Sequence, residues 1–199
     1  MTVVLELQEL LVPGPADWRA WLEEHHARSP GVWLVLGRKG GSLTTMTWAT
    51  AVDEALCFGW IDGQAAKRDD VSSLQRMTPR RPRSTWSARN VANVARLEQE
   101  GRMRPAGRAA VAAAQADGRW DRAYDGPADA HVPDDLAAAI ASDPRAQAMF
   151  DVLTASNRYA LIHRTVTAVK PETRARRIAG FVELLARYEA PFPQKRRPQ

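Results

Sequence analysis

Hydrophobic residues recur at every third or fourth position over most of the chain, which is the pattern of amphipathic helices. The pattern predicts helices near residues 17–28, 47–58, 84–101, 105–116 and 134–141, and further helices that begin near residues 143, 156 and 171. In the helix over residues 47–58, Leu56 lies on the inner face, whereas Asp53 and Glu54 are expected outside. Asp17 and Ser156 are expected to cap the helices that they precede, because their side chains can accept a hydrogen bond from the first turn.

Three segments depart from the helical period. Residues 32–36 form a continuous apolar run, and residues 60–67 and 72–78 are two short segments joined by a turn at Asp69-Asp70. We predict that these segments pair in one small antiparallel sheet. The predicted fold class is therefore α+β, with the sheet packed by helices and followed by a helical C-terminal subdomain.

A polar segment, residues 117–133, separates two parts of the chain. We therefore expect an α+β N-terminal region over residues 1–118 and a helical C-terminal subdomain over residues 134–190. Residues 191–199 contain three prolines and a run of three basic residues, so they are expected to form a disordered basic tail.

The chain is basic, with a net charge of +5 and a pI near 9.9. A basic balance favours nucleic acid, acidic protein surfaces or anionic small molecules as partners.

The single cysteine, Cys57, excludes an internal disulfide and a zinc site built from cysteines. We expect no metal and no cofactor. The N-terminus lacks the features of a signal peptide, and no apolar run approaches the roughly 20 residues of a membrane span, so we expect a cytoplasmic protein without stable membrane insertion.

The most unusual stretch lies between Phe58 and Asn90, where basic residues clearly outnumber acids and two tryptophans flank them. Guanidinium groups present a planar fork to phosphate or carboxylate, so this stretch predicts an anion-binding surface. The candidate ligand-binding residues are Trp60, Asp62, Lys67, Arg76, Arg80, Arg81, Ser84, Trp86 and Asn90. Ser84 is expected to cap the next helix and to add its N-terminus to the site. Trp60 and Asp62 are open to two interpretations, as the floor of a pocket or as core packing followed by a turn.

A second group of candidates lies near the C-terminus. Its members offer an aromatic ring, an imidazole or a positive charge, and they are Tyr159, His163, Lys170, Arg174 and Arg177. His163 could act as a general base, but the sequence ties no nucleophile or second acid to it, so we predict no catalytic residue.

Two motifs are specific when they occur together. Residues 54–63 read EALCFGWIDG, and residues 170–178 read KPETRARRI. With SPGVWL at residues 29–34 and LEQEGRM at residues 97–103, these motifs resemble the bacteriocin-protection family of YdeI/OmpD-associated proteins over about residues 16–190. The resemblance implies a role in resistance to bacteriocins or cationic peptides, which is a form of stress resistance, and association with a porin. It implies no catalytic residue.

The preferred function is a non-enzymatic cytoplasmic protein of this type, whose anion-binding surface meets an anionic small molecule or an acidic protein surface. Two alternatives stay open. A nucleic-acid-binding module would use interleaved tryptophans and arginines to stack bases and hold phosphates. An enzyme acting on an anionic small molecule would need a closed pocket that combines Asp62, His163 and the arginines.

Overall fold

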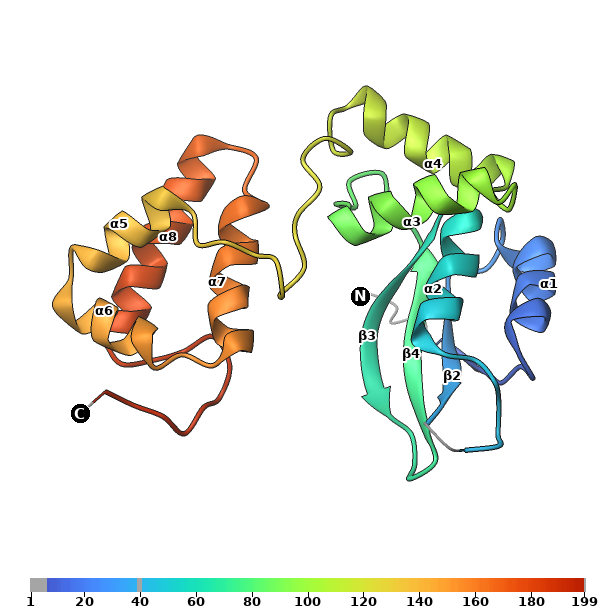
Figure 1. The fold of residues 1–199 in the computed structure, drawn as a ribbon, viewed down its shortest axis with the longest axis horizontal. Coiled ribbons are helices and arrows are strands. Elements are labelled where there is room, and N and C mark those ends of the chain that lie inside the picture. Colours follow the sequence, from blue (N-terminus) through green and yellow to red (C-terminus); the bar gives the residue numbers. More distant parts are fainter. Residues whose placement is uncertain (1–6, 39–40, 199) are drawn as a thin grey trace, which may run out of the picture. The chain divides into compact units, whose positions relative to one another are not determined.

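A computed structural model describes residues 7–38 and 41–198 of the chain. The chain divides into two compact units, of which the first ends at Arg122 and the second begins at Ala123 (Figure 1). Within the described residues, the first unit contains a sheet and helices, and the second contains helices alone.

The sheet contains, in spatial order, β1 (Glu9–Leu10), β2 (Val32–Gly37), β4 (Ser72–Pro79) and β3 (Trp60–Lys67). The three predicted strands pair antiparallel in this one sheet, so the predicted fold class is confirmed. The short strand β1 pairs in parallel with β2 and makes the sheet mixed. Asp69 forms the predicted turn, because its Oδ1 accepts hydrogen bonds from the N–H groups of Val71 and Ser72 at 2.9 and 2.7 Å.

The helices of the first unit are α1 (Pro15–His25), α2 (Trp48–Cys57), α3 (Ala88–Gln99) and α4 (Pro105–Ala116). The helix α2 lies across one face of the sheet, with α1 beside it and α3 and α4 at one end (Figure 1). The core between them is made of fully buried side chains, which include Trp18, Leu22, Leu34, Leu56 and Met77.

Two predicted caps of this unit are wrong. Helix α1 begins at Pro15, and the carboxylate of Asp17 lies inside its first turn, where it accepts a hydrogen bond from the N–H of Gly14 at 3.1 Å. Helix α3 is capped by Ser87, whose Oγ accepts from the N–H of Asn90 at 3.2 Å. Ser84 instead turns the preceding loop, because its Oγ accepts from the N–H of Arg81 at 3.0 Å.

The predicted outward position of Glu54 is also wrong. Glu54 is 6% exposed and lies between two arginines. Its carboxylate oxygens pair with Nη1 of Arg19 at 2.7 Å and with Nη2 of Arg102 at 2.6 Å. A buried carboxylate needs such partners, because an uncompensated charge inside a protein is costly. The pair of arginines thus joins α1 and the loop after α3 to α2.

The second unit consists of α5 (Asp134–Ala141), α6 (Pro144–Asp151), α7 (Ala155–Val166) and α8 (Pro171–Ala186). Their apolar faces meet in a core whose buried members include Leu136, Ile140, Met149, Leu161, Phe181 and Leu185. Helix α6 begins near residue 143 as predicted, and its cap is Asp143, whose Oδ1 accepts from the N–H groups of Arg145 and Ala146 at 2.9 and 3.0 Å. The cap of α7 is Thr154 rather than Ser156, so this helix begins two residues earlier than predicted.

The segment after α8, which was expected to be disordered, is held at its start by one buried amide. Asn157, which is 1% exposed, accepts a hydrogen bond from the N–H of Phe192 at 2.7 Å and donates to the carbonyl of Phe192 at 3.1 Å. Its Nδ2 also donates to Oε1 of Gln194 at 2.8 Å. These bonds lay residues 192–194 against the beginning of α7.

In the part of the chain that the structure describes, no helix combines the length and the apolar character that a membrane crossing requires.

Candidate functional site

Trp60 belongs to the core of the first unit. Its side chain is 1% exposed, and its Nε1 donates to the carbonyl of His26 at 3.1 Å. The rings of Trp18 and Trp21 meet it edge to face, at centroid distances of 6.2 and 5.8 Å. Trp60 therefore anchors the packing of α1 on the sheet. Asp62 lies within β3 and accepts a hydrogen bond from Nε1 of Trp48 at 3.1 Å, so it also has a structural partner.

Trp86 is likewise covered. Its side chain is 1% exposed, with the guanidinium carbon of Arg80 at 3.5 Å from the ring centroid and the ring of Trp120 at 4.9 Å. Arg80 also donates through Nη1 to the carbonyl of Thr85 at 3.1 Å. A cation packed on an aromatic face in this way stabilises the loop that carries it. In this arrangement the indole face is occupied by protein and offers no platform for a base.

The other residues predicted for this surface are dispersed. Lys67 is exposed and pairs with Asp70 at 3.3 Å, and Asn90 is buried in the first turn of α3. Arg76 lies half-buried in β4, in register with Trp33, whereas Arg81 is exposed in the loop that follows the strand. The structure thus brings Arg80 and Trp86 together but buries Trp60 elsewhere, in contact with Trp18 and Trp21.

The second unit carries two hollows that share one arginine, Arg164, in their linings. The first, which we call the aromatic hollow, has a volume of about 390 Å³. Its lining is Pro127, Ala155, Ser156, Tyr159, Ala160, His163, Arg164 and Phe192. Tyr159 and His163, both predicted candidates, face it from α7, and Phe192 reaches it from the segment that Asn157 holds. Aromatic and apolar walls of this kind suit a flat ring.

The second, which we call the arginine hollow, has a volume of about 470 Å³. Its lining is Arg164, Arg176, Arg177, Gly180, Phe181, Leu184, Ala190 and Pro191. Three of these residues are arginines and none is acidic. Arg177 is fixed, because its Nη1 donates to the carbonyl of Arg164 at 2.5 Å. Arg164 and Arg176 are exposed and pair with no acid among the residues that the structure describes.

The positive charge of the arginine hollow acts on its neighbour His163. Burial lowers the pKa of His163, and the charges of Arg164 and Arg177 lower it further. The imidazole is therefore neutral at pH 7, with the ring of Tyr124 in edge contact at 4.5 Å. Burial also raises the pKa of Tyr159, whose hydroxyl donates to the carbonyl of Asp125 at 3.0 Å. The charge in the lining of the aromatic hollow is thus that of Arg164, which also lines the arginine hollow.

Two of the predicted C-terminal candidates are engaged elsewhere. Arg174 forms a bidentate pair with Asp135, at 2.6 and 2.8 Å, and also donates to the carbonyl of Thr165. Lys170 is exposed at the start of α8 and lines neither hollow. Sequence reasoning missed Arg164, Arg176 and Phe192. The run of arginines at residues 174, 176 and 177 was a usable signal for Arg176, whereas nothing local indicates that Phe192 folds back onto α7.

Comparison with known proteins finds a family match in each of the two parts of the chain. Residues 10–110, just over half of the chain, match the family described as Domain of unknown function (DUF8412). The chain belongs to this family. Residues 129–188 match the family described as Bacteriocin-protection, YdeI or OmpD-Associated, so the predicted resemblance is confirmed for that part of the chain. The motif EALCFGWIDG lies in the first matched segment and KPETRARRI in the second. No curated protein and no solved structure matches the chain significantly.

Proposed function

We propose that this protein is a non-enzymatic cytoplasmic binding protein of the bacteriocin-protection type, and that its ligand is an anionic small molecule held at Arg164, Arg176 and Arg177. The observation that carries the proposal is the arginine hollow, with three guanidinium groups and no acid in its lining. This hollow lies in the unit that matches the bacteriocin-protection family. The proposed anion site therefore moves from the predicted loop around Arg80 to α7 and α8.

Electrostatics support an anion as the ligand. Like charges that share a hollow repel one another, and a bound carboxylate or phosphate would relieve this repulsion. The arginine side chains offer forked donors that match the oxygens of such a group. Arg177 is already oriented by its bond to the carbonyl of Arg164, so less conformational entropy is lost when it binds.

The neighbouring aromatic hollow supports a ligand that also carries a ring. Arg164 lines both hollows, so a molecule whose anionic group meets the arginines can place a flat ring beside Tyr159 and His163. Because His163 is neutral at pH 7, it adds no charge to this part of the site. We therefore infer an aromatic or otherwise cyclic carboxylate or phosphate as the ligand class.

Arg176→Ala is expected to weaken binding of an anionic ring compound by about 10- to 100-fold, because a hydrogen bond to a charged group contributes about 1.5–3 kcal/mol. The measurement is calorimetric titration of the full chain with 2-naphthoate, inorganic phosphate and a panel of nucleotides. The matched control is Arg187→Ala, which removes an arginine of the same helix region that already pairs with Glu189 at 3.2 Å. Equal affinity of the wild type and Arg176→Ala, or no measurable affinity in either, would falsify the proposal.

The nucleic-acid alternative makes a different prediction. Because Trp86 is buried beneath Arg80 and Trp120, we expect oligonucleotides to bind weakly, through phosphates alone, and to be released at physiological salt. A gel-shift series with single-stranded and duplex oligomers at low and physiological salt checks this, with Trp86→Ala as the variant. Sub-micromolar binding that survives physiological salt and is lost in Trp86→Ala would reverse the ranking of the two functions.

A further inference from the structure

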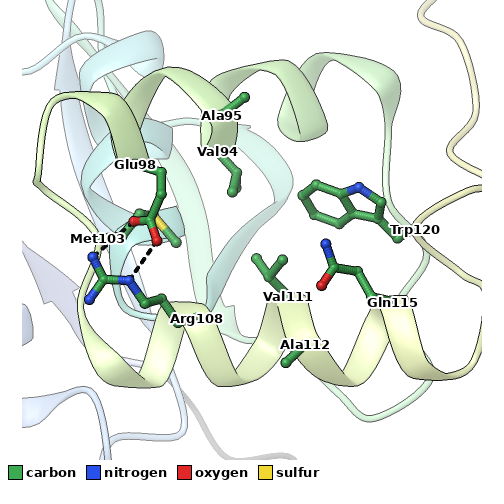
Figure 2. A pocket seen from close by; sticks show the side chains of 9 residues that line it. All are labelled: Val94, Ala95, Glu98, Met103, Arg108, Val111, Ala112, Gln115 and Trp120. Carbon is green, nitrogen blue, oxygen red and sulfur yellow. Dashed lines mark hydrogen bonds and ion pairs between the residues drawn. The ribbon is translucent and has the colours of Figure 1, made fainter.

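A groove runs between α3 and α4 in the first unit, remote in sequence from the arginine hollow. Its volume is about 330 Å³, which is within the range of about 300–1,000 Å³ that small-molecule sites occupy. Figure 2 shows Val94 pointing into it from α3 and Val111 from α4, with Met103 at the back. Val94 and Met103 are 6% and 3% exposed, so the floor of the groove is part of the core. The middle of the groove is therefore apolar.

One end of the groove is closed by an ion pair between two of its lining residues, Glu98 and Arg108. Nε and Nη2 of Arg108 donate to the two carboxylate oxygens of Glu98 at 2.6 and 2.9 Å (Figure 2). The pair bridges α4 and α3 and leaves no net charge at this end. A charged ligand would have to break it, whereas an uncharged ligand can pack against it.

The opposite end offers a ring and an amide. The indole of Trp120 and the side chain of Gln115 lie side by side there (Figure 2). Trp120 is half-buried, and its ring contacts that of Trp86 at a centroid distance of 4.9 Å. The amide of Gln115 makes no side-chain hydrogen bond within residues 7–38 and 41–198, so both its donor and its acceptor are available.

We propose that this groove binds an uncharged small molecule with a flat ring system and one amide or hydroxyl group. The ring would lie between Val94 and Val111 and pack against Trp120, where an aromatic contact adds stabilisation beyond the burial of area. The polar group would exchange hydrogen bonds with Gln115. The self-paired Glu98 and Arg108 would exclude the anions that the arginine hollow is proposed to take.

The test uses 2-naphthamide and 2-naphthoate, which share a ring but differ in charge. Titration of the full chain with 2-naphthamide is followed by the indole ¹⁵N–¹H NMR signals, with that of Trp120 assigned from a Trp120→Phe variant. We expect 2-naphthamide to shift the Trp120 signal, and 2-naphthoate to leave it unchanged. Ala112→Phe, which fills the groove from its rim, is expected to weaken 2-naphthamide binding by about tenfold or more.

Two controls separate the groove from other sites. Ala109→Phe adds the same ring to an exposed position of α4 that does not line the groove, and it is expected to leave binding unchanged. Arg176→Ala is also expected to leave 2-naphthamide binding unchanged, because Arg176 lines the arginine hollow and not the groove. The two proposed sites can therefore be tested, and can fail, independently. Gln115→Leu keeps the size of the side chain and removes its hydrogen bonds, and it is expected to weaken 2-naphthamide binding even if Ala112→Phe proves unstable. An unmoved Trp120 signal at saturating 2-naphthamide, or equal losses in Ala109→Phe and Ala112→Phe, overturns the proposal.

Discussion

Glu54→Gln is expected to lower the free energy of unfolding of the first unit by roughly 3–5 kcal/mol, which is the usual cost of removing one partner from a buried ion pair. The carboxylate of Glu54 is the shared partner of two arginines, and its side chain is only 8% exposed. The side chains of Arg19 and Arg102 are 21% and 32% exposed, so water would compensate little of the charge that the substitution leaves behind.

The bonds around Glu54 explain why the loss should be large. Arg19 also donates to the carbonyl of Arg102 at 2.9 Å, so the two arginines are linked to each other as well as to the carboxylate. Burial by itself would lower the pKa of Arg102, but its hydrogen bonds with Glu100 and Glu54 raise it above its ordinary value. Because arginine is not deprotonated in proteins, the guanidinium stays charged without Glu54, and glutamine cannot neutralise it.

Tryptophan fluorescence during urea unfolding measures this effect in the first unit alone. All seven tryptophans of the chain lie between residues 18 and 120. The matched control is Glu98→Gln, which removes a carboxylate of similar geometry from the pair with Arg108. Both side chains of that pair are about half exposed, at 47% and 53%, so the expected loss is below about 1 kcal/mol. Equal losses of unfolding free energy in the two variants would show that the burial of Glu54 adds nothing to the stability that its ion pairs provide.

The fold was largely predictable because its signals are local. The strands β2, β3 and β4 follow short β-rich runs, and α4 begins and ends at the predicted residues because Pro105 opens it and the Ala-rich run continues to Ala116. The position of Glu54 was not predictable. A charged residue is expected on the outer face of a helix, and its partners lie 35 residues before it and 48 residues after it in the sequence.

The candidate site was also harder to predict, because the partners of its charged residues lie far away in the sequence. A local excess of arginine indicates an anion site only if acids from elsewhere do not neutralise it. Arg68 pairs with Glu9, which lies 59 residues away, and Arg80 packs on Trp86, so much of the excess between Phe58 and Asn90 has internal partners. The arginine hollow depends on the return of the chain after α8, which places Ala190 and Pro191 beside residues of α8. No local pattern predicts that these residues line one hollow.

Gly107→Ala is expected to destabilise the first unit by about 3 kcal/mol, at the upper end of the usual cost of overpacking. Gly107 lies in the first turn of α4, where this helix meets the end of α2. A Cβ atom at this position would lie 2.3 Å from the carbonyl oxygen of Cys57 and 2.8 Å from that of Leu56. These are backbone atoms, and the carbonyl of Cys57 already accepts a hydrogen bond from the N–H of Arg104 at 3.0 Å, so they cannot move aside without cost.

The sign of this effect makes the test decisive. Alanine in place of glycine within a helix normally stabilises a protein by roughly 0.5–1 kcal/mol, because glycine loses more conformational entropy on folding. Only the close backbone approach of α2 and α4 reverses that expectation. The measurement is again urea unfolding followed by tryptophan fluorescence, with Ala109→Ser, on the exposed face of the same helix, as a control expected to stay within about 0.5 kcal/mol of the wild type. Because α4 forms one wall of the α3–α4 groove, Gly107→Ala should also weaken binding of 2-naphthamide by displacing Val111. A variant that is more stable than the wild type would mean that α4 does not contact the end of α2 in solution, and the proposed groove would then lose the wall on which it depends.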